Sequence, residues 1–311
     1  MSKQFISGMA LSLLVALYGC GAPGQGDKST FTTGQVTISV DNTLEPYVST
    51  SIFNFINLNQ GSDIEGIYLP EVLAFEALKE DSVKAIIACR QLTDKENEYF
   101  QKRKIVPKYT ELGKDAIAFL INKNNPDSLI KASTLRKIFN GEISSWKDVN
   151  KSQSEGAITV VFDHAGASTV SALKRQFDVD DLPSFMYALE KNNDVVDYVS
   201  KNRGAIGVIG NNWINNLNRL ELESFNDKVQ MALISAMNDD QYFVRPDQTY
   251  IADSTYAFTR TIWAINCESR VGLASGLISF MATDRGQRIM LKSGLLPKWM
   301  PPREILIHTN D

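Results

Sequence analysis

Four small or hydroxylated residues, Gly166, Ala167, Ser168 and Thr169, stand where an apolar run gives way to an amphipathic stretch. The run at 158–162 predicts a strand, and apolar residues after the turn recur at helical spacing. The first turn of a helix has N–H groups without intrahelical partners, and small side chains let an anion approach them. The stretch FDHAGASTV is therefore a candidate anion site, although an ordinary helix N-cap is the better interpretation of this turn taken alone.

Two further strand-to-helix turns carry polar residues. Asn42 and Thr43 follow a predicted strand at 36–40, and Arg90 follows another at 83–89. Three such turns, one with an arginine, favour an anion site more than one turn does. The pattern alone does not specify which anion.

Other kinds of chemistry find little support in the sequence. The two histidines, His164 and His308, are far apart and have no Cys or His at metal-ligand spacing, so no metal site is predicted. There is no Gly-x-Ser-x-Gly elbow and no Walker-type loop, and no cofactor is predicted. Cys89 and Cys267 both stand beside apolar residues, which favours buried free thiols over a disulfide.

Composition sets the scale of the fold and excludes one class of partner. The chain has 311 residues, of which 43% are hydrophobic, enough for more than one domain. Its formal net charge is -4, and no basic stripe with interleaved aromatics occurs, so no nucleic-acid partner is expected. An anionic ligand would have to be attracted by local groups.

The N-terminus has the features of an export signal. Lys3 precedes an apolar segment at 5–17 that is too short to span a bilayer. The segment ends in Leu-Tyr-Gly-Cys, which resembles a bacterial lipobox and predicts lipidation of Cys20. We expect a signal peptide at 1–19 and a flexible polar tether at 20–35. A plain signal peptide with a chance cysteine is the alternative.

Strands and helices alternate along the rest of the chain, which predicts an α/β fold with mostly parallel sheets. Thr93 and Glu96 have capping-box spacing and predict the start of a helix. Val48, Ile52, Phe53 and Ile56 are expected to form the buried face of another helix. Further strands are expected at 116–121, 204–210 and 256–266, and further helices at 133–139 and 195–199.

Taken together, several stretches resemble one family, the phosphate-binding lipoproteins of ABC phosphate transporters, which have the type II periplasmic-binding-protein fold. The resemblance covers residues 36–302 and is carried by DNTLEPYV, AIIACRQLTDKE, KDAIAFLINKNNPDS, LRKIFNGEISSW, FDHAGASTV, RGAIGVIG, YAFTRTIWAIN and GQRIMLKSGLLP. It implies two α/β lobes with an anion cleft between them. One lobe would take 36–118 and 256–311, and the other 119–255.

The resemblance also implies where the ligand binds. Asn42 and Thr43 match the family's first anion-binding loop, and Gly166, Ala167, Ser168 and Thr169 match its small-residue turn. Two positions depart from the family: Asp163 stands where an anion-binding arginine is usual, and Cys89 where an aspartate is usual. We infer that Arg90, from the opposite lobe, supplies the missing positive charge.

Phosphate, unlike sulfate, carries a proton near neutral pH, so a selective site can offer it a carboxylate. Asp41, Asp115 and Asp163 are the candidates for this proton acceptor. For at least one of them, a turn or capping role is the better interpretation. His164 could also face the cleft, although a solvated loop position is favoured.

The sequence thus predicts a monomeric, membrane-anchored periplasmic lipoprotein that captures phosphate, or a similar oxyanion, for an ABC permease. It does not predict an enzyme. The alternatives are a sensor or interaction module whose cleft no longer binds phosphate, because the usual arginine is missing, and, with less support, a phosphohydrolase.

Overall fold

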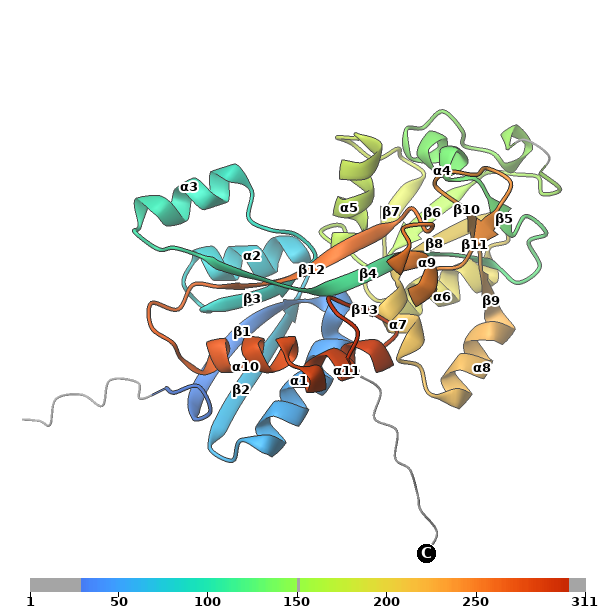
Figure 1. Cartoon of the computed structure of the whole chain (residues 1–311). Coiled ribbons are helices and arrows are strands. Elements are labelled where there is room, and N and C mark those ends of the chain that lie inside the picture. Colours follow the sequence, from blue (N-terminus) through green and yellow to red (C-terminus); the bar gives the residue numbers. More distant parts are fainter. Residues whose placement is uncertain (1–28, 150–151, 302–311) are drawn as a thin grey trace, which may run out of the picture.

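The computed structural model describes residues 29–149 and 152–301, and Figure 1 shows them as two lobes joined by long strands. The expected signal peptide, most of the tether and Cys20 lie outside the described residues. One ten-stranded sheet runs through the molecule in the order β2-β1-β3-β12-β4-β8-β6-β7, with β9 and β13 also paired to β4. No helix in the described part of the chain is long and apolar enough to cross a membrane.

The first lobe is built on three parallel strands covered by helices on both faces. The strands are β1 (Gly34–Asp41), β2 (Ser62–Leu69) and β3 (Ala85–Ala88). A 3-10 turn (Asn42–Leu44) leads from β1 into the first helix. The helices are α1 (Glu45–Leu58), α2 (Glu71–Lys79), α3 (Asp94–Lys102), α10 (Leu273–Ala282) and α11 (Asp284–Lys292).

The second lobe repeats this arrangement with three more parallel strands, β6 (Thr159–Phe162), β7 (Met186–Ala188) and β8 (Ala205–Gly210). A separate small sheet contains β5 (Leu129–Ile130), β10 (Leu233–Ser235) and β11 (Phe243–Val244). The helical segments are α4 (Ala132–Phe139), a 3-10 turn (Trp146–Asp148), α5 (Ser168–Phe177), α6 (Asn192–Lys201), α7 (Asn211–Asn215), α8 (Arg219–Lys228) and α9 (Gln248–Ala252).

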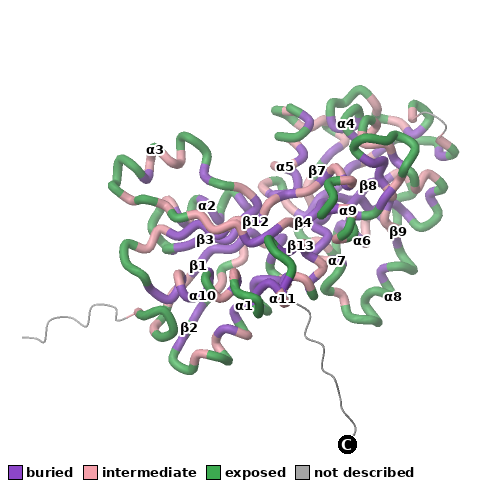
Figure 2. The backbone as a smooth tube through the Cα atoms, in the orientation of Figure 1, coloured by how far each residue is buried: buried purple, intermediate pink, exposed green. Residues whose placement is uncertain are grey.

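Two strands connect the lobes. β4 (Lys108–Asn122) pairs with β12 (Thr259–Asn266) along residues 108–116, and then with β8 and β9 (Val229–Met231) along 117–122. Its pairing partner therefore changes where the chain passes from one lobe to the other. β13 (Leu296–Pro297) adds a short antiparallel contact to β4. In Figure 2 the buried (purple) stretches of β4 and β12 lie in the middle of the molecule.

The structure confirms the predicted α/β class and most of the predicted elements. The sheet is mixed rather than mostly parallel, because β4 and β12 pair antiparallel with their neighbours. Apolar clusters lie on both faces of the sheet in each lobe. The capping box is present, since Thr93 accepts from the N–H of Glu96 and Glu96 accepts from the N–H of Thr93. One helix face was predicted wrongly: Phe53 is 64% exposed, and Phe55 is buried in its place. The buried residues of α1 are Tyr47, Val48, Ser51, Ile52 and Phe55, and the last four follow the ordinary i, i+3, i+4, i+7 pattern.

Candidate functional site

The carboxyl ends of β1, β6 and β8 meet at the junction between the lobes. Each is followed by a turn into a helical segment, so polar residues from three turns gather there. Ligands of open α/β folds bind at such strand ends because loops and helix N-termini converge on them. The predicted turn residues Thr43 and Ser168 are brought within 3.1 Å of each other, Oγ1 to Oγ, across the two lobes.

A buried ion pair lies at the centre of this junction. Asp115 on β4 and Arg260 on β12 are directly opposed in the antiparallel register, and Arg260 Nη2 lies 2.6 Å from Asp115 Oδ2. Both side chains are 1% exposed. Burial acts to lower the pKa of Arg260, but the acidic groups around it, Cys89, Asp115 and Asp41, raise it beyond its usual value. The guanidinium is therefore charged throughout the physiological range.

The guanidinium also reaches both hydroxyls. Arg260 Nη1 donates to Ser168 Oγ, and Nη2 lies 3.1 Å from Thr43 Oγ1. Its Nε is buried and has no hydrogen-bond partner. One side chain on a connecting strand thus contacts a strand-to-helix turn from each lobe, at Thr43 and at Ser168.

Thr43 is held in place by its neighbours on both sides. Asp41 Oδ1 accepts from the Thr43 N–H at 3.0 Å and from its hydroxyl at 2.8 Å. Asn212, from α7 in the other lobe, donates its side-chain amide to the Thr43 carbonyl at 3.1 Å. The Asn212 backbone N–H donates to Asp115 Oδ1 at 3.2 Å. The ion pair and both turns therefore belong to one hydrogen-bonded cluster, which we call the junction cluster: Asp41, Thr43, Asp115, Ser168, Asn212 and Arg260.

Gly210, the last residue of β8, is required by the packing of this cluster. A Cβ atom at this position would lie 2.9 Å from Arg260 Nη2 and 3.3 Å from Asp115 Oδ2. Because the guanidinium is fixed by an ion pair and two hydroxyls, it has little freedom to give way. Glycine leaves the space that the ion pair occupies.

Asp163, after β6, is a second buried carboxylate at the junction. It is 1% exposed; Asn42 Nδ2 lies 3.5 Å from its Oδ2, and its Oδ1 has no hydrogen-bond partner. Burial and the nearby Asp41 carboxylate raise the pKa of Asp163 to about 6, against an opposing effect of Arg260. The group can therefore accept or release a proton near neutral pH.

The remaining predicted residues lie around the cluster. Ser168 begins α5, as expected, and Thr169 is buried with no hydrogen-bond partner for its hydroxyl. Ala167 is fully buried in the apolar core. A Cβ on Gly166 would lie 3.4 Å from Val72 on α2, so this turn packs close to the first lobe. His164 Nδ1 accepts from the Gly166 N–H at 3.0 Å.

Arg90 has other partners in the structure. Its Nη1 lies 2.8 Å from Glu96 Oε2 and its Nε 3.2 Å from Glu71 Oε1, and its guanidinium carbon lies 3.5 Å from the centre of the Phe75 ring. Arg90 is therefore fixed beside α2 and α3 by these contacts. Contact between Arg90 and an anion stays a prediction from the sequence. Cys89 and Cys267 are free, and burial raises the pKa of the Cys89 thiol well above its usual value.

Sequence reasoning did not single out Arg260, Asn212 or Gly210. A signal for Arg260 was present, because Phe258, Arg260, Ile262 and Ala264 alternate along one strand and share its buried face. An arginine on such a face needs a partner, and the cross-strand neighbour Asp115 supplies it. No comparable signal marks Asn212, whose role depends on the approach of the two lobes.

The arrangement can bind an oxyanion through one guanidinium, several hydroxyls and the free N–H groups at the start of α5. Its carboxylates can also accept a hydrogen bond from a protonated oxygen of that anion. Within residues 29–149 and 152–301, no three or more His, Cys, Asp or Glu side chains are grouped so as to hold a metal ion.

Residues 25–285 match the family model of the PBP superfamily domain. The phosphate-binding protein PstS of Staphylococcus aureus strain USA300 is 23% identical over 294 residues, covering 91% of this chain and 85% of that protein.

Solved structures show the same fold. A Clostridium perfringens substrate-binding protein, assigned to a phosphate ABC transporter and solved with phosphate, matches with a TM-score of 0.71 at 20% identity, covering 85% of this chain and 99% of that one. An ABC-type phosphate transport receptor from Vibrio cholerae matches with a TM-score of 0.66 at 17% identity, covering 85% and 100%. The expected type II periplasmic-binding-protein fold is confirmed.

Proposed function

The chain belongs to the PBP superfamily, and from this premise we propose that it captures phosphate, or a similar oxyanion, outside the cytoplasm and delivers it to an ABC permease. The names of its relatives support this assignment: a phosphate-binding protein, a substrate-binding protein solved with phosphate, and a phosphate transport receptor. These names also favour a binding protein over an enzyme such as a phosphohydrolase.

The observation that carries the proposal is the meeting of Thr43, Ser168 and Arg260 between the lobes. Each lobe contributes a hydroxyl, and a connecting strand contributes the positive charge. Charge-assisted hydrogen bonds from a guanidinium are strong and suit a tetrahedral oxyanion. A ligand held by both lobes would stabilise the closed arrangement, as in other hinged binding proteins.

In this structure the three groups bond to one another, so an anion must replace those contacts. We propose that the lobes separate about β4 and β12, that the anion enters, and that Arg260 and Ser168 then donate to it. Asn42, Thr43 and Thr169 would add polar contacts, and the small side chains of Gly166 and Ala167 would leave room at the start of α5. Arg260 thus takes the role that sequence reasoning gave to Arg90.

The proton acceptor that we propose is Asp163. Asp115 is paired with Arg260, whereas Asp41 Oδ2 and Asp163 Oδ1 are both buried without a hydrogen-bond partner. Asp163 is preferred over Asp41 because burial raises its pKa to about 6 and because it lines a pocket at the junction. A protonated phosphate oxygen could donate to Asp163. Sulfate has no proton near neutral pH and would be repelled by the same carboxylate.

The placement of the protein in the cell is also a proposal. We propose a signal peptide at 1–19, lipidation at Cys20 and a tether at 20–35, which would hold a monomer at the membrane near its permease. We further propose lobe boundaries at 118/119 and 255/256. The change in β4 pairing between residues 116 and 117 supports the first of these.

One observation favours a second candidate, a sensor or interaction module that does not bind phosphate. Asp115 already neutralises Arg260, and Asp41 and Asp163 add negative charge beside it. A site in which carboxylates outnumber the one guanidinium attracts a dianion less than a site with an unpaired arginine does.

Calorimetric titration of the purified full chain distinguishes the two candidates. The proposed function predicts saturable binding of phosphate and much weaker binding of sulfate. If neither anion binds at millimolar concentration, the sensor or interaction role replaces it.

A further inference from the structure

A pocket of about 450 Å³ opens at the edge of the lobe junction, directly beside the junction cluster. Asn42 and Asp163 line it, and these residues are the chain neighbours of Thr43 and of the turn before Ser168. Residues of both lobes contribute to its walls. Thr43, Ser168 and Arg260 are buried behind Asn42 and Asp163. A ligand whose anionic end reached Arg260 after the proposed separation of the lobes would therefore extend its remaining atoms past these two residues into this pocket.

The charge of the pocket is opposite to that required for phosphate. Three carboxylates line it, from Glu45, Asp163 and Glu190, whereas Lys191 is its one cationic side chain. With every group ionised the lining carries a net charge of -2, and one of its carboxylates is almost fully buried. Such a lining attracts a positive group and repels a second anionic one.

The pocket also has acceptors without donors. Asn42 Oδ1, Asp163 Oδ1 and Asn192 Oδ1 are buried and have no hydrogen-bond partner. The orientation of the Asn42 amide follows from its Nδ2, which faces Asp163 Oδ2 at 3.5 Å and leaves the oxygen unpaired. Buried unpaired acceptors are costly, and a ligand with several N–H donors would satisfy them. An ammonium group supplies three such donors.

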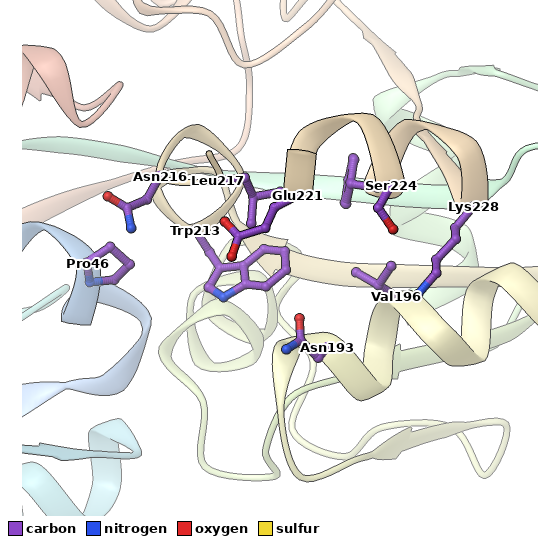
Figure 3. Close-up of a pocket in the computed structure, with 10 residues that line it drawn as sticks. Pro46, Asn193, Val196, Trp213, Asn216, Leu217, Glu221, Ser224 and Lys228 are labelled. Atoms are coloured by element: carbon purple, nitrogen blue, oxygen red, sulfur yellow. The ribbon is translucent and has the colours of Figure 1, made fainter. Parts of the chain in front are cut away.

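An aromatic wall completes the environment of a cation. Trp213 on α7 lines this pocket and also the neighbouring one of about 390 Å³, which shares Pro46, Asn193 and Asn216 with it. Figure 3 shows the Trp213 indole lying between Asn193 and Glu221, with Pro46 of the first lobe to one side. Tryptophan faces attract ammonium groups more strongly than other aromatic side chains do.

We propose that the cleft takes a zwitterionic phosphorus compound, a small phosphate monoester or phosphonate that carries a primary amine. Its phosphoryl group would bind Thr43, Ser168 and Arg260, and its ammonium group would bind Asn42, Trp213 and Asp163 in the adjacent pocket. The Asp163 carboxylate would then accept from the ammonium group in place of the proton of a bare phosphate. The inference rests on the proposed function, since it uses the same phosphoryl site. It adds that the ligand is larger than the bare anion and is positively charged at its other end.

The test compares two matched ligands, 2-aminoethylphosphonate and ethylphosphonate, which differ only in the amine. Calorimetric titration of the full chain, purified in detergent, is expected to show the amine-bearing ligand binding at least about tenfold more tightly. Inorganic phosphate is titrated in parallel. Glu190→Gln removes one pocket carboxylate and is expected to weaken 2-aminoethylphosphonate several-fold while phosphate affinity is unchanged. Glu142→Gln, at an exposed position after α4, is the matched control and should change neither.

The outcomes separate the two proposals. If phosphate binds and the two phosphonates bind equally, the zwitterion inference is overturned and the proposed function stands. If Glu190→Gln weakens phosphate and 2-aminoethylphosphonate alike, the pocket does not hold the amine. If none of the three ligands binds, both proposals fail together.

Discussion

Asp115 and Arg260 are directly opposed on the two strands that join the lobes, with Oδ2 and Nη2 2.6 Å apart. The pair therefore lies on the strands about which we propose that the lobes move, and its guanidinium bonds to a hydroxyl from each lobe. A positive charge held at this position contacts both lobes only when they are closed. This links the proposed ligand site to the proposed motion, because any rotation about β4 and β12 must change the contacts of Arg260.

Removing Arg260 is expected to lower both stability and binding. Arg260→Gln leaves Asp115 buried without its cation, and breaking one partner of a buried ion pair costs about 3–5 kcal/mol. The double variant Asp115→Asn/Arg260→Gln removes both charges and should recover part of that stability. Neither variant should bind phosphate. Urea unfolding and calorimetric titration measure the two effects; a double variant that binds phosphate as well as the native chain would exclude Arg260 from the site.

Arg90→Ala tests whether the arginine predicted from the sequence binds the anion. The alternative is that Arg260, found at the junction, binds it. Arg90 pairs with the buried Glu71, which would lose its hydrogen-bonded partner, so we expect a loss of about 1–3 kcal/mol of stability. We expect phosphate affinity to change by less than about threefold, because the ion pairs of Arg90 are with Glu71 and Glu96. The sequence-based assignment predicts a loss of at least about tenfold, and such a loss would restore Arg90 as an anion ligand.

Stability is expected to depend on Asp163 between about pH 4 and pH 6. The pKa of Asp163 is raised to about 6 in the folded protein, mainly by burial, so the folded chain keeps a proton that the unfolded chain has released. The free energy of unfolding should therefore fall as the pH rises through this window. Asp163→Asn should remove the fall and be more stable at pH 7 by about 1–3 kcal/mol.

Urea unfolding at several pH values checks this expectation for the native chain and for Asp163→Asn. Asp181→Asn, at an exposed position, is the control and should leave the curve unchanged. If the free energy of unfolding depends on pH identically in the native chain and in Asp163→Asn, Asp163 is ionised in the folded protein throughout this pH range.

Gly210→Ala should disturb the ion pair without removing any charge. The added Cβ would lie 2.9 Å from Arg260 Nη2, closer than such contacts allow. Overpacking of this kind costs about 1–3 kcal/mol, and displacement of the guanidinium should also weaken phosphate binding. Thermal unfolding and titration of this variant are the measurements. Native stability together with native affinity would show that Arg260 is free to move, contrary to the cluster described above.

Thr169→Val tests whether the first turn of α5 contacts the anion, with almost no change in the shape of the side chain. The Thr169 hydroxyl is buried and lacks a protein partner, so its removal should leave stability equal or slightly higher. If the hydroxyl donates to the bound anion, affinity should fall by about 0.5–1.5 kcal/mol. Unchanged phosphate affinity at unchanged thermal midpoint would remove Thr169 from the site.

The sequence predicted the elements more completely than the site. Strands such as 36–40 and 158–162 and the capping box at Thr93 depend on local patterns, and the structure confirms them. The turn at Ser168 was also predicted, since strand–turn–helix order is local. Arg260 and Asn212 act through contacts between segments far apart in the chain, which periodicity does not report. Arg90 was favoured because it follows a strand and because Asp163 stands where the family usually has an arginine, but its acidic neighbours Glu71 and Glu96 were not considered together with it.

The most direct test of the central claim is a crystal structure of the protein grown with phosphate. The account predicts a phosphate ion between the lobes, with Arg260 nitrogen and Ser168 oxygen atoms within about 3 Å of its oxygens. The present 3.1 Å contact between Thr43 and Ser168 should then be replaced by contacts to the anion. Crystals from saturating phosphate that retain the direct contacts of Arg260 with Thr43 and Ser168, and show no anion beside them, would contradict the account.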